Sequence, residues 1–220
     1  MSINISSLKI KLTDSPNELQ KKVNAAIAEK LNSTIAANLR RMEKDLAILI
    51  KGWLAVQPEM IALATGGPGS LPSQLGLVSG SENRIKNVII DSIADSAKIS
   101  FTRFDRGLKR KSGNFTITCQ PQDYSNLISL PEADVRIASG NINWLQWLLE
   151  AGNKVIVVGY KYSPTAGQGR SRGGVMAEGP SFSWRVPPQY SGTVDDNFIT
   201  RALSGKEKSI QQLLERYVKG

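Results

Sequence analysis

Apolar residues recur every three or four positions through the first quarter of the chain, which is the spacing of one face of an α-helix. Asp14 or Ser15 can cap the first turn, Pro16 suits its first position, and Gly52 marks the end. We therefore predict a helix over residues 14–52, about nine to ten turns long. Its apolar positions are Leu19, Val23, Ile27, Leu31, Ile35, Leu39, Met42, Leu46, Leu49, Ile50 and Trp53.

This predicted helix is much longer than the average globular helix of roughly eleven to twelve residues. Its apolar face can lie on a sheet as part of the core, which is the commoner arrangement for such a stripe. In the alternative arrangement, part of the helix docks on a neighbouring subunit. The pattern alone is compatible with both.

Two segments are predicted to be loops. Residues 65–80 hold five glycines and two prolines in sixteen positions, and residues 163–174 are rich in glycine, serine and arginine. A sixteen-residue loop is long for a compact domain, which indicates a functional loop or one that a partner orders. The 163–174 segment is predicted to be a mobile loop that becomes ordered against a partner.

Alternating apolar and polar positions predict a β-hairpin with strands at 98–104 and 114–119. The turn between them carries the densest basic cluster of the chain, opposed only by Asp105. The cluster is either a solvated hairpin tip or a finger that reaches DNA or an acidic groove. Its basic residues are Arg103, Arg106, Lys109, Arg110 and Lys111.

The other predicted elements are shorter. Gly152 is expected to stop the helix predicted at 141–151. The segment of the predicted C-terminal helix begins at Thr193, with Asp195 or Asp196 as the cap and an interruption at Gly205. We predict helices at 82–96 (capped by Ser81), at 141–151 and at the C-terminus, and strands at 154–162, 175–176 and 181–186.

This order of elements indicates the α+β class, with an antiparallel sheet packed by the long N-terminal helix and a C-terminal helix. The length of 220 residues fits a single domain over 1–220 with long appendages. Trp144, Trp147 and Trp184 are expected to pack in the core or in an interface. Glu150 is expected to pair with Arg185 or Arg201.

Composition narrows the possible chemistry. The chain has no histidine, and Cys119 is its only cysteine, so histidine-based catalysis and cysteine metal clusters are excluded. The glycines of 167–174 do not match a phosphate-binding loop, because the Gly-Lys-Ser/Thr ending is missing. We therefore expect no enzyme, no cofactor and no metal. No apolar stretch is long enough for a membrane span, and no secretory signal is evident.

The C-terminal third resembles the neck and tail-completion proteins of tailed bacteriophages. The resemblance rests on four motifs in the same order and spacing: an aromatic/Leu-Glu-small-Gly element, an Arg-x-Gly-Gly-type segment, a Trp-Arg-Val-Pro segment and the start of the closing helix. The corresponding segments are residues 147–152, 171–176, 184–187 and 197–203. The matching residues are Trp147, Glu150, Gly152, Arg172, Gly173, Gly174, Trp184, Phe198, Arg201, Ala202 and Leu203.

The resemblance implies a virion protein that forms a ring, as a hexamer or dodecamer, at the head–tail junction. It implies neighbours among connector or stopper proteins and tail tube or sheath proteins, and assembly in the cytoplasm of a bacterial host. The net charge of +9 is compatible with non-specific contact with genomic DNA or with an acidic neighbour. The alternative function is a nucleic-acid-binding protein that uses the 103–111 hairpin together with Arg170 and Arg172.

Overall fold

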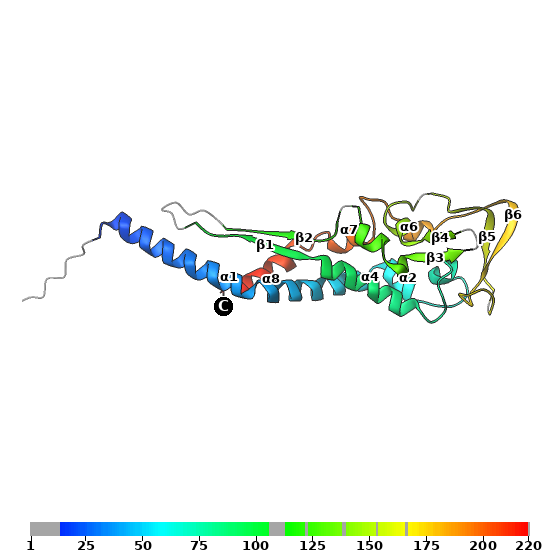
Figure 1. The fold of residues 1–220 in the computed structure, drawn as a ribbon, viewed down its shortest axis with the longest axis horizontal. Coiled ribbons are helices and arrows are strands. Elements are labelled where there is room, and N and C mark those ends of the chain that lie inside the picture. Colours follow the sequence, from blue (N-terminus) through cyan, green and yellow to red (C-terminus); the bar gives the residue numbers. More distant parts are fainter. Residues whose placement is uncertain are drawn as a thin grey trace, which may run out of the picture.

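A computed structural model describes residues 14–105, 113–121, 123–137, 140–152, 154–165 and 167–219. The molecule is elongated (Figure 1). The first helix, α1 (Pro16–Ala55), runs along much of its length, and the last helix, α8 (Glu207–Lys219), packs against α1. With small antiparallel sheets beside these helices, the predicted α+β class is confirmed.

Helix α1 begins where the sequence predicts and ends three residues later. The Ser15 hydroxyl accepts from the backbone N–H of Glu18, and the Glu18 carboxylate accepts from the backbone N–H of Ser15. This capping box satisfies two N–H groups of the first turn and lowers the pKa of Glu18. Gly52 does not stop the helix. The chain turns only before Pro58, which begins α2 (Pro58–Ala64).

The core lies between α1 and the elements that follow it. Met42, Leu46 and Ile50 of α1 are buried against the apolar face of α4 (Glu82–Ser96), which includes Ile89 and Ile93. The predicted bounds of α4 are confirmed, but the predicted cap is wrong. The Ser81 hydroxyl donates to the backbone carbonyl of Val78 and makes no capping hydrogen bond.

The strands form three separate two-stranded antiparallel sheets. The first sheet is the predicted basic hairpin, and the third lies at the end of the molecule opposite the start of α1 (Figure 1). The middle sheet, from two four-residue strands, was not predicted. The pairs are β1 (Lys98–Thr102) with β2 (Asn114–Thr118), β3 (Asp134–Ile137) with β4 (Gly140–Asn143), and β5 (Val157–Ser163) with β6 (Val175–Trp184).

Two predicted elements of the C-terminal half need correction. The predicted helix at 141–151 is wrong in its first part, because residues 140–143 pair with β3 and only α6 (Leu145–Leu149) is helical. The predicted strands 175–176 and 181–186 are parts of one strand, β6. A register shift between Val158 and Tyr160 of β5 lets β6 continue through the glycine-containing stretch that seemed to separate them.

Short helical turns complete the fold. The segment 65–80 is not all loop, because it contains α3 (Leu71–Gln74). The final helix is divided into α7 (Phe198–Leu203) and α8, with Gly205 at φ +70° between them, as predicted. The other turns are α5 (Ser125–Ile128), η1 (Pro131–Ala133) and η2 (Pro188–Tyr190).

Candidate functional site

The basic hairpin is fastened to α1 by Glu43, which accepts from the N–H of Ile99 near the base of the hairpin, and by Asn32 nearer its turn. The Asn32 amide nitrogen donates to the carbonyl of Phe104 (3.1 Å), and the Phe104 N–H donates to the Asn32 amide oxygen (2.9 Å). Phe104 lies beyond the end of β1, and the Asn32 side chain supplies the two hydrogen bonds that a neighbouring strand would otherwise make to its backbone. The ring of Phe101 packs against those of Phe104 and Phe115 at centroid distances of 5.7 and 5.1 Å. These rings stack on each other and offer no platform for bases.

Of the predicted basic cluster, Arg103 lies in the described part of the hairpin and is exposed. Arg106, Lys109, Arg110 and Lys111 lie outside the described residues. The β1–β2 hairpin extends toward the end of the molecule where α1 begins, whereas β5 and β6 form the opposite end (Figure 1). The structure therefore does not bring Arg103 together with Arg170 and Arg172, which follow β5.

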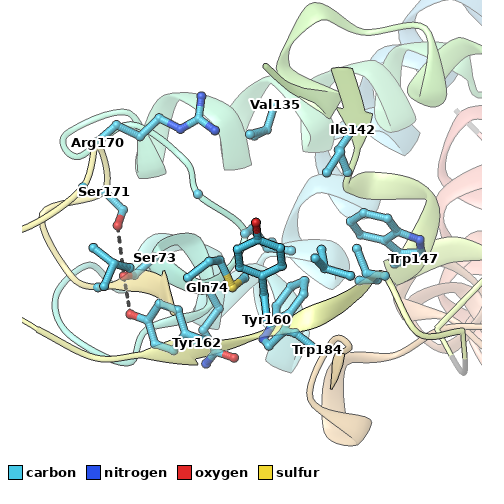
Figure 2. A pocket seen from close by; sticks show the side chains of 18 residues that line it. Ser73, Gln74, Val135, Ile142, Trp147, Tyr160, Tyr162, Arg170, Ser171 and Trp184 are labelled. Carbon is cyan, nitrogen blue, oxygen red and sulfur yellow. Dashed lines mark hydrogen bonds between the residues drawn. The ribbon is translucent and has the colours of Figure 1, made fainter. Parts of the chain in front are cut away.

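A cavity of about 490 Å³ lies between the β3–β4 and β5–β6 hairpins (Figure 2). Val135 and Ile142 line it from β3 and β4, and residues of β5, β6 and the segments 65–80 and 163–174 line the remainder. Tyr160 of β5 points into it and is 36% exposed, so the cavity is open to solvent. Its lining is mostly apolar and aromatic, which is typical of binding pockets.

Two of the predicted motif tryptophans belong to this cavity. Trp147 and Trp184 line it from α6 and β6, and Trp184 is largely buried. Trp144 instead lies in the core, fully buried, where its indole N–H donates to the carbonyl of Glu132 (2.8 Å). All three tryptophans are therefore packed, as predicted, and two of them also shape a surface cavity.

A hydroxyl network joins the two predicted loops at one wall of the cavity. The Tyr162 hydroxyl donates to the carbonyl of Gly173 (2.7 Å) and lies 2.5 Å from the Ser73 hydroxyl. The Ser73 hydroxyl is also 3.2 Å from that of Ser171, and the N–H of Gly69 donates to Tyr162. The 163–174 segment, predicted to order on a partner, is in this way tied to the 65–80 segment of its own chain.

The Arg-x-Gly-Gly segment fits closely against this network. A Cβ atom on Gly173 would collide with Ser73 and with the carbonyl of Gly67, and one on Gly174 would collide with the ring of Tyr162. Glycine is needed here for close approach of the backbone. Arg172 is exposed with φ +53°. Beside it, Arg170 donates to the carbonyl of Arg136 (2.6 Å) and lines the cavity.

The motif residues Arg201 and Glu150 have partners other than those predicted. Arg201 of α7 pairs with Glu59, which is fully buried, and with Asp196 (2.5 Å). The predicted pairing of Glu150 with Arg185 or Arg201 is wrong. Glu150 instead accepts from the side-chain amide of Gln146, one turn earlier (3.3 Å).

Asn197, not Asp195 or Asp196, caps α7, the first part of the predicted C-terminal helix. It is fully buried, and its amide oxygen accepts from the backbone N–H groups of Ile199 and Thr200. Its amide nitrogen donates to the hydroxyl of Tyr124 and to nearby backbone carbonyls. The neighbouring motif residues Phe198 and Ala202 are fully buried, and Leu203 packs on the core. This part of the motif thus has a structural role.

Gly152 allows two backbone segments to touch. It does not stop α6, which ends at Leu149. Its N–H donates to the carbonyl of Gly192 (3.0 Å), and a Cβ atom at this position would collide with Ser191. The glycine of this motif is therefore explained by close packing rather than by helix termination.

The chain's one thiol and the acidic side chains of the described residues offer little chemistry of their own. Burial raises the pKa of the Cys119 thiol, which weakens it as a nucleophile. No group of three or more His, Cys, Asp or Glu side chains that could hold a metal ion occurs in the part of the chain that the structure describes. Among these residues no single helix is long and apolar enough to cross a membrane. Helices α1 and α2 taken together have the required length and composition, but the chain bends by 76° between them.

Comparisons with protein-family models, with curated proteins and with solved structures gave no match to this chain.

Replacing Tyr162 with phenylalanine is expected to loosen the contact between the two loops. The change removes one of the two hydroxyl partners of Ser73 and leaves the Gly173 carbonyl without its donor, at a cost of about 1–3 kcal/mol in the free energy of unfolding. Amide hydrogen exchange should become faster in residues 167–174. Tyr160→Phe is the matched control, since the Tyr160 hydroxyl has no hydrogen-bond partner among the described residues. Equal exchange in both variants would contradict the proposed contact.

Proposed function

We propose that this chain is a structural subunit of a tailed-bacteriophage virion that forms a ring at the head–tail junction. The observation that carries the proposal is apolar surface that the described residues leave exposed at both ends of an elongated subunit. At one end Leu19, Val23 and Ile27 of α1 are 45%, 49% and 53% exposed, and at the other end the apolar cavity opens to solvent. Soluble monomers rarely leave such surfaces uncovered, whereas assembly subunits use them.

The motif residues support this proposal in a second way. The four motifs that resemble neck and tail-completion proteins lie in one connected region, where they line the cavity or hold together the elements around it. A subunit that joins other subunits needs such a rigid end, because a contact surface that changes shape loses affinity on binding.

The alternative function is binding of nucleic acid through the basic hairpin. The reciprocal hydrogen bonds between Asn32 and Phe104 favour it, because they hold the hairpin to α1 on its turn side, next to Arg103, which is exposed. Binding of this kind would weaken steeply with increasing salt.

Measuring the mass of the purified chain by light scattering, with negative-stain images of the same fraction, tests the proposal. We expect a closed ring, either a hexamer or a dodecamer, because a contact between two different faces closes when the rotation between subunits allows it. A ring in solution and the chain's presence in purified virions would support the junction. A monomer that binds duplex DNA at low salt would overturn it in favour of the alternative.

A further inference from the structure

The β1–β2 sheet has one edge that its own chain covers and one that it leaves open. β1 lies beside α1, whose Glu43 carboxylate accepts from the N–H of Ile99 (3.1 Å), and β2 lies on the side away from α1 (Figure 1). Beyond the end of β1, Asn32 of α1 satisfies the backbone of Phe104. The open edge of this sheet is therefore that of β2.

The register of the hairpin identifies the backbone groups on the open edge. Since the N–H of Ile99 points toward α1, Ile99 and Ile117 are a pair without mutual hydrogen bonds. Such pairs alternate with hydrogen-bonded ones, so Phe101 and Phe115 are a pair of the same kind. The N–H and C=O groups of Phe115 and Ile117 therefore point away from β1, and they have no hydrogen-bond partner among the described residues.

β2 lacks the features that usually keep a strand edge from pairing with another chain. Natural proteins protect such edges with charged side chains, with proline or with a bulge. β2 has the sequence Asn-Phe-Thr-Ile-Thr, which holds neither charge nor proline, and it pairs with β1 without a register shift. The open stretch ends at Gln120, whose N–H donates to the Ser96 hydroxyl of α4 (3.2 Å). This short, uncharged edge suits the addition of one more strand.

The spacing of the unpaired groups matches a second copy of the same edge. When β2 of two copies run antiparallel with Thr116 opposite Thr116, Phe115 of each copy lies opposite Ile117 of the other. Both of these pairs are of the hydrogen-bonded kind, so all the unpaired N–H and C=O groups of the two edges find partners. No like charges meet, and threonine opposite threonine is a favourable cross-strand pair.

We propose that the open edge of β2 binds the same edge of a second copy, which joins two hairpins into one antiparallel sheet in the order β1-β2-β2-β1. The inference goes beyond the proposed function and does not rest on it. A two-fold contact of this kind closes on itself, whereas copies in a ring with different faces toward head and tail are not related by such an axis. The pair therefore belongs to the free chain rather than to the ring.

Disulfide trapping detects this pair even though one strand edge is far smaller than the roughly 1,200–2,000 Å² of a stable interface. Cys119 is first replaced by serine, so that an introduced cysteine is the only thiol. Thr116→Cys then places the two thiols at the two-fold axis, where the Cα atoms of such a pair are about 4.5 Å apart, within disulfide range. The chain is diluted until light scattering shows no ring, and copper phenanthroline is added as the oxidant. We expect a covalent dimer.

Ser100→Cys is the matched control for Thr116→Cys. Ser100 lies directly opposite Thr116 on β1, and both residues are exposed. In the proposed sheet the two copies of Ser100 are three strand spacings apart, which is about 14 Å. Since only the Thr116 positions lie within disulfide range, we expect about tenfold more covalent dimer from Thr116→Cys. Equal amounts from the two variants would indicate random collisions and overturn the proposal.

A charge on the edge tests the pair without a cross-link. Thr116→Lys places two ammonium groups opposite each other across the axis, whereas Ser100→Lys adds the same charge away from it. With increasing concentration of the chain, amide hydrogen exchange at Phe115 and Ile117 should slow in Ser100→Lys and stay unchanged in Thr116→Lys. Slow exchange at every concentration would overturn the proposal in favour of an occupant from the same chain, such as residues 1–13.

The result is separate from the test for the ring. Rings in light scattering without a specific Thr116→Cys product would leave the proposed function standing and reject the pair. The specific product from a chain that forms no ring at any concentration would support the pair and reject the ring.

Discussion

Replacing Arg201 with alanine is expected to lower the free energy of unfolding by about 3–5 kcal/mol, because it leaves a buried carboxylate without its counter-ion. Glu59 is fully buried, and one of its carboxylate oxygens already lacks a hydrogen-bond partner in the described structure. Arg201 compensates the other oxygen and also pairs with Asp196. Denaturant unfolding followed by tryptophan fluorescence measures the loss.

Two further variants show whether the pair itself is responsible. Arg185→Ala removes an exposed arginine from the same part of the chain and should change stability by no more than about 0.5 kcal/mol. Replacing both partners, Glu59→Leu with Arg201→Met, should recover most of the loss, since apolar residues of similar volume can take the place of a buried ion pair. A loss below about 1 kcal/mol for Arg201→Ala would mean that water reaches Glu59.

Replacing Asn197 with alanine is expected to cost about 3 kcal/mol. About 1 kcal/mol comes from the lost helix cap, and the remainder comes from buried carbonyls and the Tyr124 hydroxyl that lose their donor. Asn197→Ser separates the two effects, because serine caps a helix about as well as asparagine but cannot reach Tyr124. We expect serine to recover only the cap's share in the same unfolding assay. Full recovery by serine would contradict a role for the buried network.

Local patterns in the sequence were sufficient for the long helix and the basic hairpin. The start of α1, the bounds of α4 and the β1–β2 hairpin depend on capping residues and on periodicity over neighbouring positions, and these are visible in the sequence. The β3–β4 sheet was not predicted because its strands have only four residues, too few for a clear alternation. Asn141 and Ile142 instead seemed to begin the helix that holds Trp144.

The candidate site depends on contacts between distant parts of the chain, so only some of its members could be predicted from the sequence. Trp147, Trp184 and Gly174 were singled out from motifs, and they lie at the cavity. Ser73 and Tyr162 were missed, since a hydroxyl network across 89 residues leaves no periodic signal. Glu59 was missed because no helix was predicted at 58–64, and its burial depends on a partner, Arg201, that lies 142 residues away in the sequence. The partner of Arg201 could not be chosen from spacing alone.

The contact between the first and last helices has a consequence for synthesis on the ribosome. The Tyr217 hydroxyl donates to Asp45 (2.7 Å) across 172 residues, so α1 lacks this cover until almost the whole chain has been made. Closing so large a loop is slow compared with forming local helices. Nascent chains therefore expose the part of the α1 surface that α8 covers for most of translation, and we expect ribosome-bound chaperones to associate with them until the C-terminal helix emerges.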